Sequence, residues 1–175
     1  MNVSGSDDEV DAILAGWRRV RPDLDPSPLA VFSRLLRLSW HMDKFRKETL
    51  SVHGLEPWEF EMLTLLRREG EPYELAPSAF MAELLVPSGT LTHRINLMVE
   101  RGYAVRHQDE TDRRVKYVKA TPLGIQRADE AMVDLLGHEA EMTSDLAEAD
   151  RTELARLLKV LLSRFDSATS PEELT

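Results

Sequence analysis

The stretch from residue 77 to residue 121 constrains the fold of this chain more than any other part. Residues 77–85 begin with a proline and are mostly apolar, which predicts a short helix, because proline suits the first helical turn. After a turn, a second helix is predicted over residues 88–102. Residues 103–107 and 115–120 have the composition of two strands that flank a charged turn. Helix, turn, helix and two-stranded ribbon in this order predict a winged helix-turn-helix.

The second helix of this stretch has sides of different chemistry. Ser88 is expected to be its N-cap. The apolar residues at helical spacing, which should form the buried stripe, are Leu91, Ile95, Met98 and Val99. The residues expected roughly opposite this stripe, facing outward, are Thr90, His93, Leu97 and Arg101. Arg94 is expected on the flank between the two sides.

Further helices are predicted on both sides of this stretch. The residues that share one face of a short helix over 7–20 are Val10, Ile13, Leu14 and Trp17. Prolines then break the pattern, and apolar periodicity predicts helices over 28–54, 57–70, 122–146 and 150–165. The helix over 28–54 is about 25 residues, which is long for a small domain. We expect it to pack against a second chain, with ordinary core packing as the alternative.

These patterns together predict a mainly α fold with a small β-wing. The winged helix-turn-helix DNA-binding region would occupy residues 55–120. N- and C-terminal dimerisation helices, formed by 28–54 and 121–166, would flank it. Residues 1–27 would form an extra N-terminal helix and a proline-rich connector, and 167–175 a frayed tail.

Charge is unevenly distributed along the chain. The formal net charge is −9, which by itself argues against a nucleic-acid partner. Residues 86–119, however, hold seven Arg and Lys against four Asp and Glu, so this segment is net basic. An acidic body around a basic segment favours one orientation of approach to a DNA duplex.

Several classes of protein are disfavoured by what the sequence lacks. The chain has no cysteine, which excludes disulfides and thiolate zinc sites. No phosphate-binding loop or nucleophile motif is present, and the five histidines show no metal-ligand spacing, so we expect neither an enzyme nor a metal site. No apolar run approaches the roughly 18 residues needed to cross a bilayer. The first residues also do not resemble a secretory signal. We therefore expect a cytoplasmic protein without a membrane partner.

Four segments carry a resemblance to a known family. Residues 109–114 (Asp-Glu-Thr-Asp-Arg-Arg) and 118–124 (Val-Lys-Ala-Thr-Pro-Leu-Gly) resemble the wing signature of MarR-type transcription regulators. Residues 88–95 resemble the recognition helix of that family, and residues 58–61 resemble part of the helix before it. The resemblance covers about residues 28–165. It implies a homodimeric repressor that binds a pseudopalindromic operator on double-stranded DNA and is released by a small ligand.

The predicted second helix would read DNA from the major groove, where base edges present distinguishable patterns. Its first residues, Ser88, Gly89 and Thr90, are expected to meet phosphates through backbone N–H groups and hydroxyls. Thr92 and His93 are the candidates for contacts with base edges. The alternative for His93 is a solvated surface histidine.

The charged turn of the ribbon would act as the wing. Arg113 is expected to enter the minor groove, where a narrow A·T-rich groove attracts a guanidinium group. Asp109 would pair with Arg113 and orient it, and Arg114 and Lys116 would add positive charge. The alternative is a solvated hairpin tip.

A narrower resemblance is to the urate-responsive PecS/UrtR branch, and it rests on Trp17 with the following residues 21–25. It implies a ligand site formed by Trp17, Glu61, Arg94 and Arg106, in which Arg94 would serve both DNA and ligand. Glu61 stands where the branch usually has Asp. The expected effector is urate or another aromatic anion, and no cofactor is expected. The alternative is that Trp17 is a core residue and Glu61 forms a structural ion pair with one of the two arginines.

A second departure from the pattern of the family concerns DNA binding. Leu97 stands where the family often has Arg, which suggests a weaker grip on phosphate or a contact with a thymine methyl group. Two other functions stay open from the sequence: a winged-helix regulator without a small-molecule ligand, and a winged-helix module that binds only proteins.

Overall fold

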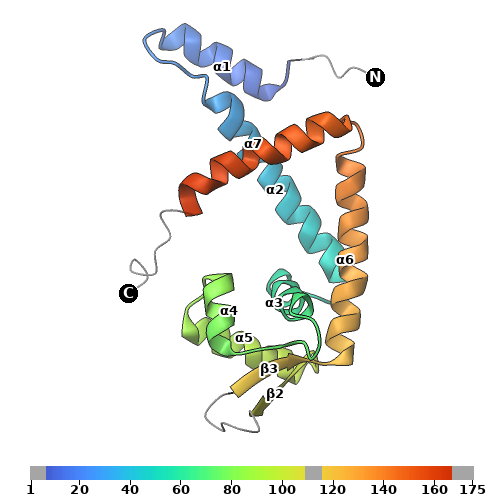
Figure 1. Cartoon of the computed structure of the whole chain (residues 1–175). Helices are drawn as coiled ribbons and strands as arrows, with labels where there is room; N and C mark the ends of the chain where they lie inside the picture. The colour runs from blue at the N-terminus through green and yellow to red at the C-terminus, as the bar shows by residue number, and fades with distance from the viewer. Residues whose placement is uncertain (1–6, 109–115, 167–175) are drawn as a thin grey trace. The chain divides into compact units, whose positions relative to one another are not determined.

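The computed structural model of the chain describes residues 7–108 and 116–166. It confirms a mainly helical fold with a small antiparallel sheet (Figure 1). The elements, in chain order, are α1 (Glu9–Val20), α2 (Leu29–Val52), α3 (Pro57–Arg68), β1 (Glu74–Leu75), α4 (Pro77–Leu84), α5 (Ser88–Glu100), β2 (Ala104–Gln108), β3 (Lys116–Ala120), α6 (Pro122–Met142) and α7 (Glu148–Asp166). The chain divides into two compact units within α6, after Leu135. The first unit holds α1 to most of α6, and the second holds the end of α6 and α7.

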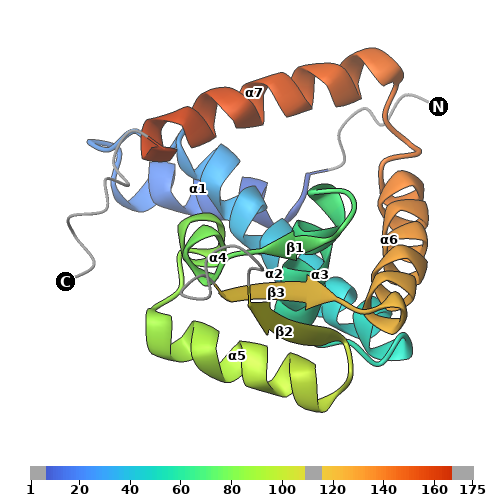
Figure 2. The ribbon, with the colours of Figure 1, turned by 60° about the horizontal axis from the view of Figure 1, so that its bottom comes forward.

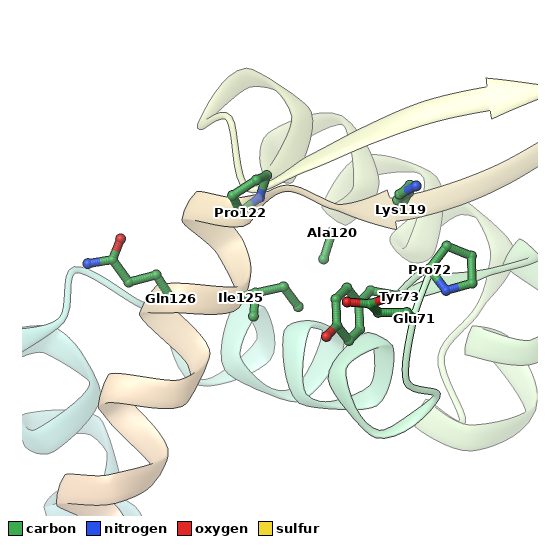
Figure 3. Close-up of a pocket in the computed structure, with 8 residues that line it drawn as sticks. All are labelled: Glu71, Pro72, Tyr73, Lys119, Ala120, Pro122, Ile125 and Gln126. Carbon is green, nitrogen blue, oxygen red and sulfur yellow. The ribbon is translucent and has the colours of Figure 1, made fainter.

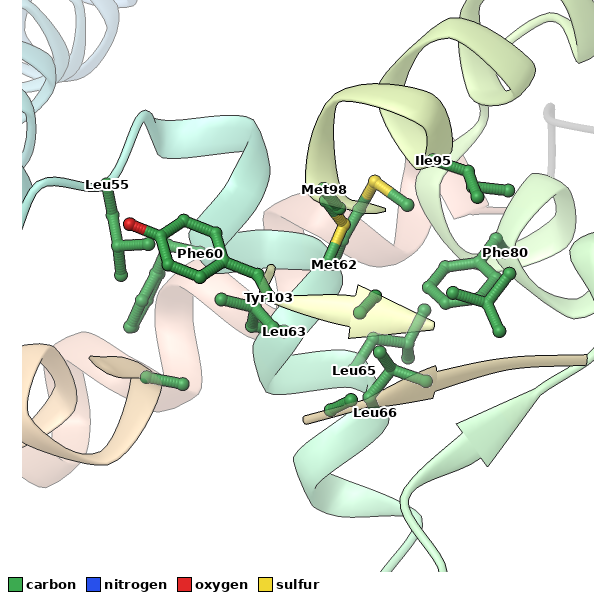
Figure 4. Packing of buried hydrophobic residues seen from close by; sticks show 14 of the residues in the cluster. Leu55, Phe60, Met62, Leu63, Leu65, Leu66, Phe80, Ile95, Met98 and Tyr103 are labelled. Atoms are coloured by element: carbon green, nitrogen blue, oxygen red, sulfur yellow. The ribbon is translucent and has the colours of Figure 1, made fainter. Parts of the chain in front are cut away.

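The core of the first unit is built around α3. Apolar residues lie on most sides of this helix, which predicts deep burial, and the structure confirms it. The buried apolar residues of α3 are Phe60, Met62, Leu63, Leu65 and Leu66. In Figure 4 they lie between Leu55 and Tyr103 on one side and Phe80 and Ile95 on the other. Because α3 contacts elements on all these sides, it fixes α5 and the sheet relative to each other.

The sheet has three strands rather than the predicted two. Its order is β1-β3-β2, with both neighbouring pairs antiparallel (Figure 2). The additional strand, β1, has two residues and pairs Glu74 with Lys119 and Leu75 with Val118. A strand this short has no alternation that a sequence can reveal, so it is defined only by its pairing with β3.

The helix starts test the predicted caps. Thr121 caps α6, because its hydroxyl oxygen accepts the Gly124 amide at 3.0 Å. Ser88 is not the N-cap of α5. That position belongs to Pro87, whose extended backbone starts the helix without a side-chain cap. The last helix begins at Glu148, two residues before the predicted start at residue 150.

Several apolar residues in or next to the helices are exposed rather than buried. In α1, Val10 and Leu14 are buried as expected, whereas Ile13 and Trp17 are not. Leu85 lies just past the end of α4 in the left-handed region, with φ 49°, and it points into solvent. Val99 lies near the end of α5 and is also exposed. In each case the residue stands at the border of an apolar stripe or at a helix end, where the core no longer covers it.

Candidate nucleic-acid interface

The first half of α5 presents polar groups to solvent. Leu91, Ile95 and Met98 are buried and hold the helix on the core, as predicted. The exposed residues of its N-terminal half are Ser88, Gly89, Thr90, Thr92 and His93. Because Pro87 offers no side-chain cap, the first N–H groups of α5 are left available, and such groups together with the helix dipole favour an anion. This end of α5 therefore suits a phosphate.

The hydroxyl of Thr92 has a defined orientation. It donates a hydrogen bond to the Ser88 carbonyl oxygen at 2.9 Å. The hydroxyl proton is thereby used within the helix, so the oxygen of Thr92 is left as an acceptor toward an external donor. An exposed acceptor of this kind is suited to the exocyclic amino group of a base.

The ribbon lies next to this end of α5. A cavity of 390 Å³ is lined by residues of α4, α5, β2 and β3, and among them are Ser88, Thr92, Arg106 and Lys116. The structure thus brings two of the predicted helix residues together with two basic residues of the ribbon. The predicted wing-tip residues Asp109, Arg113 and Arg114 lie outside the described residues.

The four residues predicted to bind a ligand are found in different surroundings. The Arg94 guanidinium lies 5.6 Å from the centre of the Trp58 ring, over its face. Glu61 is exposed on α3, three residues after Trp58, so the two share a face of that helix. No ion pair joins Glu61 to either predicted arginine among the described residues, so the structural pairing considered as the alternative is not formed.

The other two predicted ligand residues are separate from this pair. Arg106 donates to Asn96 Oδ1 at 2.6 Å and lines the 390 Å³ cavity. Trp17 is exposed on α1 and borders a different, shallow hollow together with Ile13 and Val20. Within one chain, the described pockets that contain Trp17 and Arg106 are therefore distinct.

Arg101 was expected to face outward, and its side chain is 40% exposed, but it also makes a contact that the prediction did not include. Its guanidinium turns back to the core and contacts both carboxylate oxygens of Glu59 through Nη1, at 2.7 and 2.6 Å. Helical spacing alone misses this pair, because Arg101 is the C-cap of α5 and its long side chain leaves the direction that the helix predicts.

Comparison with known proteins assigns the family. The sequence model of the MarR family matches residues 53–115. The chain is 33% identical over 150 residues to the HTH-type transcriptional regulator PecS of Dickeya dadantii, across 86% of this chain and 90% of that protein. The chain belongs to the MarR family of transcriptional regulators. It is also 30% identical over 131 residues to the regulator MhqR of Bacillus subtilis, across 74% of this chain and 85% of that protein.

Solved structures of the MarR family have the same fold. AbsC, a MarR family regulator from Streptomyces coelicolor, superposes with a TM-score of 0.72 at 21% identity, over 82% of this chain and 97% of AbsC. A mutant MarR from E. coli in complex with operator DNA gives a TM-score of 0.62 at 23% identity, over 83% of this chain and 97% of that one. The solved structures thus show the winged-helix fold, and the family assignment from the sequence matches makes this chain a DNA-binding transcriptional regulator.

The outer face of the wing sheet in this MarR-family chain carries a charged cluster. His107 Nε2 lies 2.5 Å from Glu74 Oε2, and the His107 ring stacks on Tyr117 with 5.5 Å between ring centres. The hydrogen bond that the His107 ring donates to the Glu74 carboxylate raises the pKa of His107, while the nearby Lys119 ammonium group acts in the opposite direction. The cluster connects β1 to β2 across β3.

A second cavity lies on the other side of the ribbon, where β3 leads into α6. It has a volume of 560 Å³ and is shown in Figure 3, with the Tyr73 ring and the Ile125 side chain projecting toward its centre. Tyr73 has φ 61°, which is unusual for an aromatic residue. Its ring is covered by the Arg67 guanidinium at 5.3 Å, and Arg67 bonds Asp129 of α6. Of the predicted DNA- and ligand-binding residues that the structure describes, none lines this cavity.

Two further searches concern the described part of the chain only. It contains no group of three or more His, Asp or Glu residues placed to hold a metal ion. Among its helices, none is long and apolar enough to cross a membrane.

Proposed function

We propose that this MarR-family chain is a homodimeric repressor that binds a pseudopalindromic operator and is released by a small aromatic anion. The observation that carries the DNA-binding part is the exposed polar start of α5 beside Arg106 and Lys116. In this arrangement α5 enters the major groove, where base edges are distinguishable. The ribbon lies along the adjacent backbone, and its tip, with Arg113 oriented by Asp109 and followed by Arg114, enters the minor groove.

Each α5 residue has a role in this proposal. Ser88, Gly89 and Thr90 bind a phosphate through their free N–H groups and hydroxyls. Thr92 accepts a hydrogen bond from a base amino group, and His93, which is exposed, reaches a neighbouring base edge. Leu97 is only partly exposed, which fits an apolar contact rather than a phosphate contact. Lys116 neutralises a phosphate at the base of the wing.

Exposed apolar side chains support the proposed dimer. Those of α2 are Val31, Phe32, Leu36, Leu38, Trp40 and Val52. Those of α7 are Leu154, Leu157, Val160, Leu162 and Phe165. A monomeric protein seldom leaves so many large apolar residues on its helices in water, because their burial is the main favourable term in association. We assign residues 28–54 and 121–166 to the dimer, and residues 1–27 to an accessory helix and connector.

The DNA-binding proposal is tested with the full-length protein and the DNA upstream of its own gene. We expect a gel shift that survives competitor DNA, and a footprint with two half-sites about one helical turn apart. Light scattering of the free protein should give twice the mass of the chain. A shift that disappears equally with specific and scrambled competitor would contradict sequence-specific binding. A specific shift by a protein of single-chain mass would contradict only the dimer.

For the effector, the supporting observation is the arrangement of Arg94 over Trp58 with Glu61 on the same face of α3. The Arg94 guanidinium and the Trp58 ring suit a planar anion such as urate. The Glu61 carboxylate is the nearby charge that the bound anion would repel. Arg106 and Trp17 complete the proposed site, which requires Arg106 to leave Asn96. The ligand then acts through its different affinity for the free and the DNA-bound conformations.

Titration calorimetry with urate and xanthine tests the effector. We expect binding that weakens when Arg94 is replaced by Gln, and a lower operator affinity in the presence of the ligand. Lys44→Gln serves as a control, because it removes one positive charge from α2, where Lys44 lies close to Glu48. Absence of heat with both purines, with operator binding unchanged, would favour a regulator without a small-molecule ligand.

A further inference from the structure

Glu59 is a fully buried acid at the centre of the DNA-binding region. Its side chain has no exposed surface, and it lies in the first turn of α3 among the apolar core residues. A buried carboxylate is strongly unfavourable unless it is paired and hydrogen-bonded. Both of its oxygens contact Arg101, and one of them also accepts the Glu56 amide at 2.9 Å. The burial of Glu59 is therefore compensated, and the compensation depends on Arg101.

Arg101 has contacts with three different elements. Its Nη1 binds Glu59 of α3, and its Nη2 donates to the Gly54 carbonyl oxygen at 2.5 Å, just past the end of α2. Its guanidinium lies 4.9 Å from the centre of the Tyr103 ring, immediately before β2. The Tyr103 hydroxyl also donates to the Gly54 carbonyl at 3.2 Å. We call this group of Glu59, Arg101, Tyr103 and the Gly54 carbonyl the Arg101 clamp.

We propose that the Arg101 clamp is a positioning device for DNA reading, which sets the angle of α5 relative to α3 and to the end of α2. This inference rests on the proposed function, in which α5 reads the bases. The buried anchors of α5 on the core, Leu91, Ile95 and Met98, are apolar, and apolar contacts are not directional. Asn96 of α5 also accepts a hydrogen bond from Arg106, but this bond joins α5 to β2 and not to α3 or the end of α2. A guanidinium bound to a carboxylate is directional and short. The clamp is therefore the hydrogen-bonded ionic contact that orients α5 against both α3 and the end of α2, whereas the apolar stripe supplies buried area.

Because α5 is long, a small change of its angle at the Arg101 clamp displaces its other end by a larger distance. Arg101 lies at one end of the helix and Ser88, proposed to meet DNA, at the other. At a rise of about 1.5 Å per residue they are separated by roughly 20 Å along the axis. A tilt of about 5° at the clamp then moves the reading end by roughly 1.7 Å, and hydrogen bonds to base edges tolerate only a few tenths of an ångström. Loss of the clamp should therefore weaken base reading before it weakens the general attraction to phosphate.

The contact with Gly54 extends this role to the other half-site. Gly54 directly follows α2, and the exposed apolar residues of α2 belong to the proposed dimer surface. By binding Gly54 and Glu59 at once, Arg101 joins the dimer helix to the reading helix of the same chain. The clamp thus transmits the spacing of the two subunits to their α5 helices.

Arg101 could also bind phosphate directly or only stabilise the fold. These two roles predict other effects on DNA affinity than the clamp does when the charge of Arg101 or of Glu59 is removed. If Arg101 bound phosphate, its removal would weaken every DNA, and removal of the Glu59 charge would leave affinity equal or higher. If the pair only stabilised the fold, both changes would lower stability and leave the discrimination between DNA sequences unchanged. The clamp predicts that Arg101→Gln and Glu59→Gln, which change the net charge in opposite directions, reduce discrimination in the same direction.

The test uses the full-length protein and two duplexes. One is the sequence that the unaltered protein selects from a random pool, and the other is a scrambled duplex of the same length and composition. Fluorescence anisotropy gives both dissociation constants at low temperature, where circular dichroism shows each variant to be folded. For both Gln variants we expect the constant for the selected duplex to rise about tenfold, which is within the range of one lost base contact, and that for the scrambled duplex to change less than about threefold. The double variant should resemble the single variants rather than multiply their effects.

Arg101→Lys keeps the positive charge, and it replaces the Gln variants in the test if one of them fails to fold. Lysine cannot hold Glu59 and Gly54 together in the same fork geometry, so we expect an intermediate loss of discrimination, with binding to the scrambled duplex unchanged. An unchanged ratio of the two constants in all folded variants would overturn the clamp. Failure of the unaltered protein to select any sequence would instead overturn the proposed function, and the positioning role with it.

Discussion

Gly124 of α6 lies directly against the backbone of Tyr103. A Cβ atom at position 124 would stand 2.2 Å from the Tyr103 carbonyl oxygen and 3.0 Å from a methyl carbon of Leu63. The first of these neighbours is backbone, so it cannot rotate away. Thr121, three residues earlier, donates to the Gly102 carbonyl at 2.7 Å and closes the same junction. The start of α6 is thus fitted to the turn between α5 and β2 without room for a side chain.

The first prediction concerns this junction. Gly124→Ala should lower the free energy of unfolding by about 1–3 kcal/mol, because the added methyl group forces the strand and the helix apart. Urea denaturation followed by circular dichroism measures it. Gly137→Ala is the matched control. Gly137 lies in the same helix, and a Cβ atom there would meet nothing within 4 Å. Since alanine is the better helix former, the control should gain up to about 1 kcal/mol. Equal effects at both positions would contradict the close fit.

A second prediction follows from the pair formed by His107 and Glu74. Glu74 raises the pKa of His107 above its ordinary value of 6.5. Because the folded pKa is the higher one, the charged pair stabilises the fold fully below the unfolded pKa, and this contribution is lost as pH rises through the folded pKa. The free energies of unfolding of the unaltered protein and His107→Gln should therefore differ most near pH 6. Above the raised pKa the difference should fall to a constant remainder, because the variant also lacks the stacking on Tyr117.

Glu74→Gln provides the control for this titration. It removes the acceptor but leaves the stacking of His107 on Tyr117, so the pH-dependent part of the stability should disappear. The side chain of His107 is 38% exposed, so solvent screens the pair and we expect a small effect. A difference that grows with rising pH would have the wrong sign for this pair.

The order of the elements was predictable because each of them carries a local signal. Prolines at the starts of α3, α4 and α6 and the apolar spacing within the helices are read directly from neighbouring residues. The N-cap of α5 was misassigned because Ser88 is a common cap, whereas Pro87 has φ −60° and ψ 148° and takes that place. A proline already has a φ close to this value, and it needs no hydrogen-bonding side chain to do so.

The candidate site was predictable only in part, because some of its contacts join residues far apart in sequence. Glu59 and Arg101 are 42 residues apart, and helical spacing assigns a direction to Arg101 without showing what a long side chain can reach. The strand β1 depends in the same way on its pairing with β3. By contrast, the exposure of Thr90 and His93 follows from the buried stripe of the same helix, so it was predicted correctly.

Lys116 gives a prediction for the electrostatic part of DNA binding. It is exposed at the start of β3 and lines the cavity beside Thr92. Lys116→Gln should weaken binding to selected and scrambled duplexes by the same factor, because a phosphate contact carries no sequence information. The slope of log affinity against log salt should fall in magnitude by about 2 for a dimer, about one per subunit. Lys44→Gln, with the same charge change on α2, should leave the slope unchanged. A loss confined to the selected duplex would instead assign Lys116 to base reading.

The exposed apolar side chains of α2 provide a test of the dimer. Leu36 is 74% exposed in the single chain, so Leu36→Glu should not disturb the fold of an isolated subunit. If the N-terminal half of α2 is the dimer surface, the buried charge separates the subunits, because an unpaired carboxylate in an apolar interface is strongly unfavourable. Sedimentation should then show a folded species of single-chain mass. Operator affinity should fall by about 100-fold or more, because two linked half-sites bind far more tightly than one. Leu85→Glu adds the same charge at a residue that is 59% exposed and lies outside residues 28–54 and 121–166, so this control variant should remain dimeric. A Leu36→Glu protein that stays dimeric would place the interface elsewhere and leave the exposed face of α2 without a role.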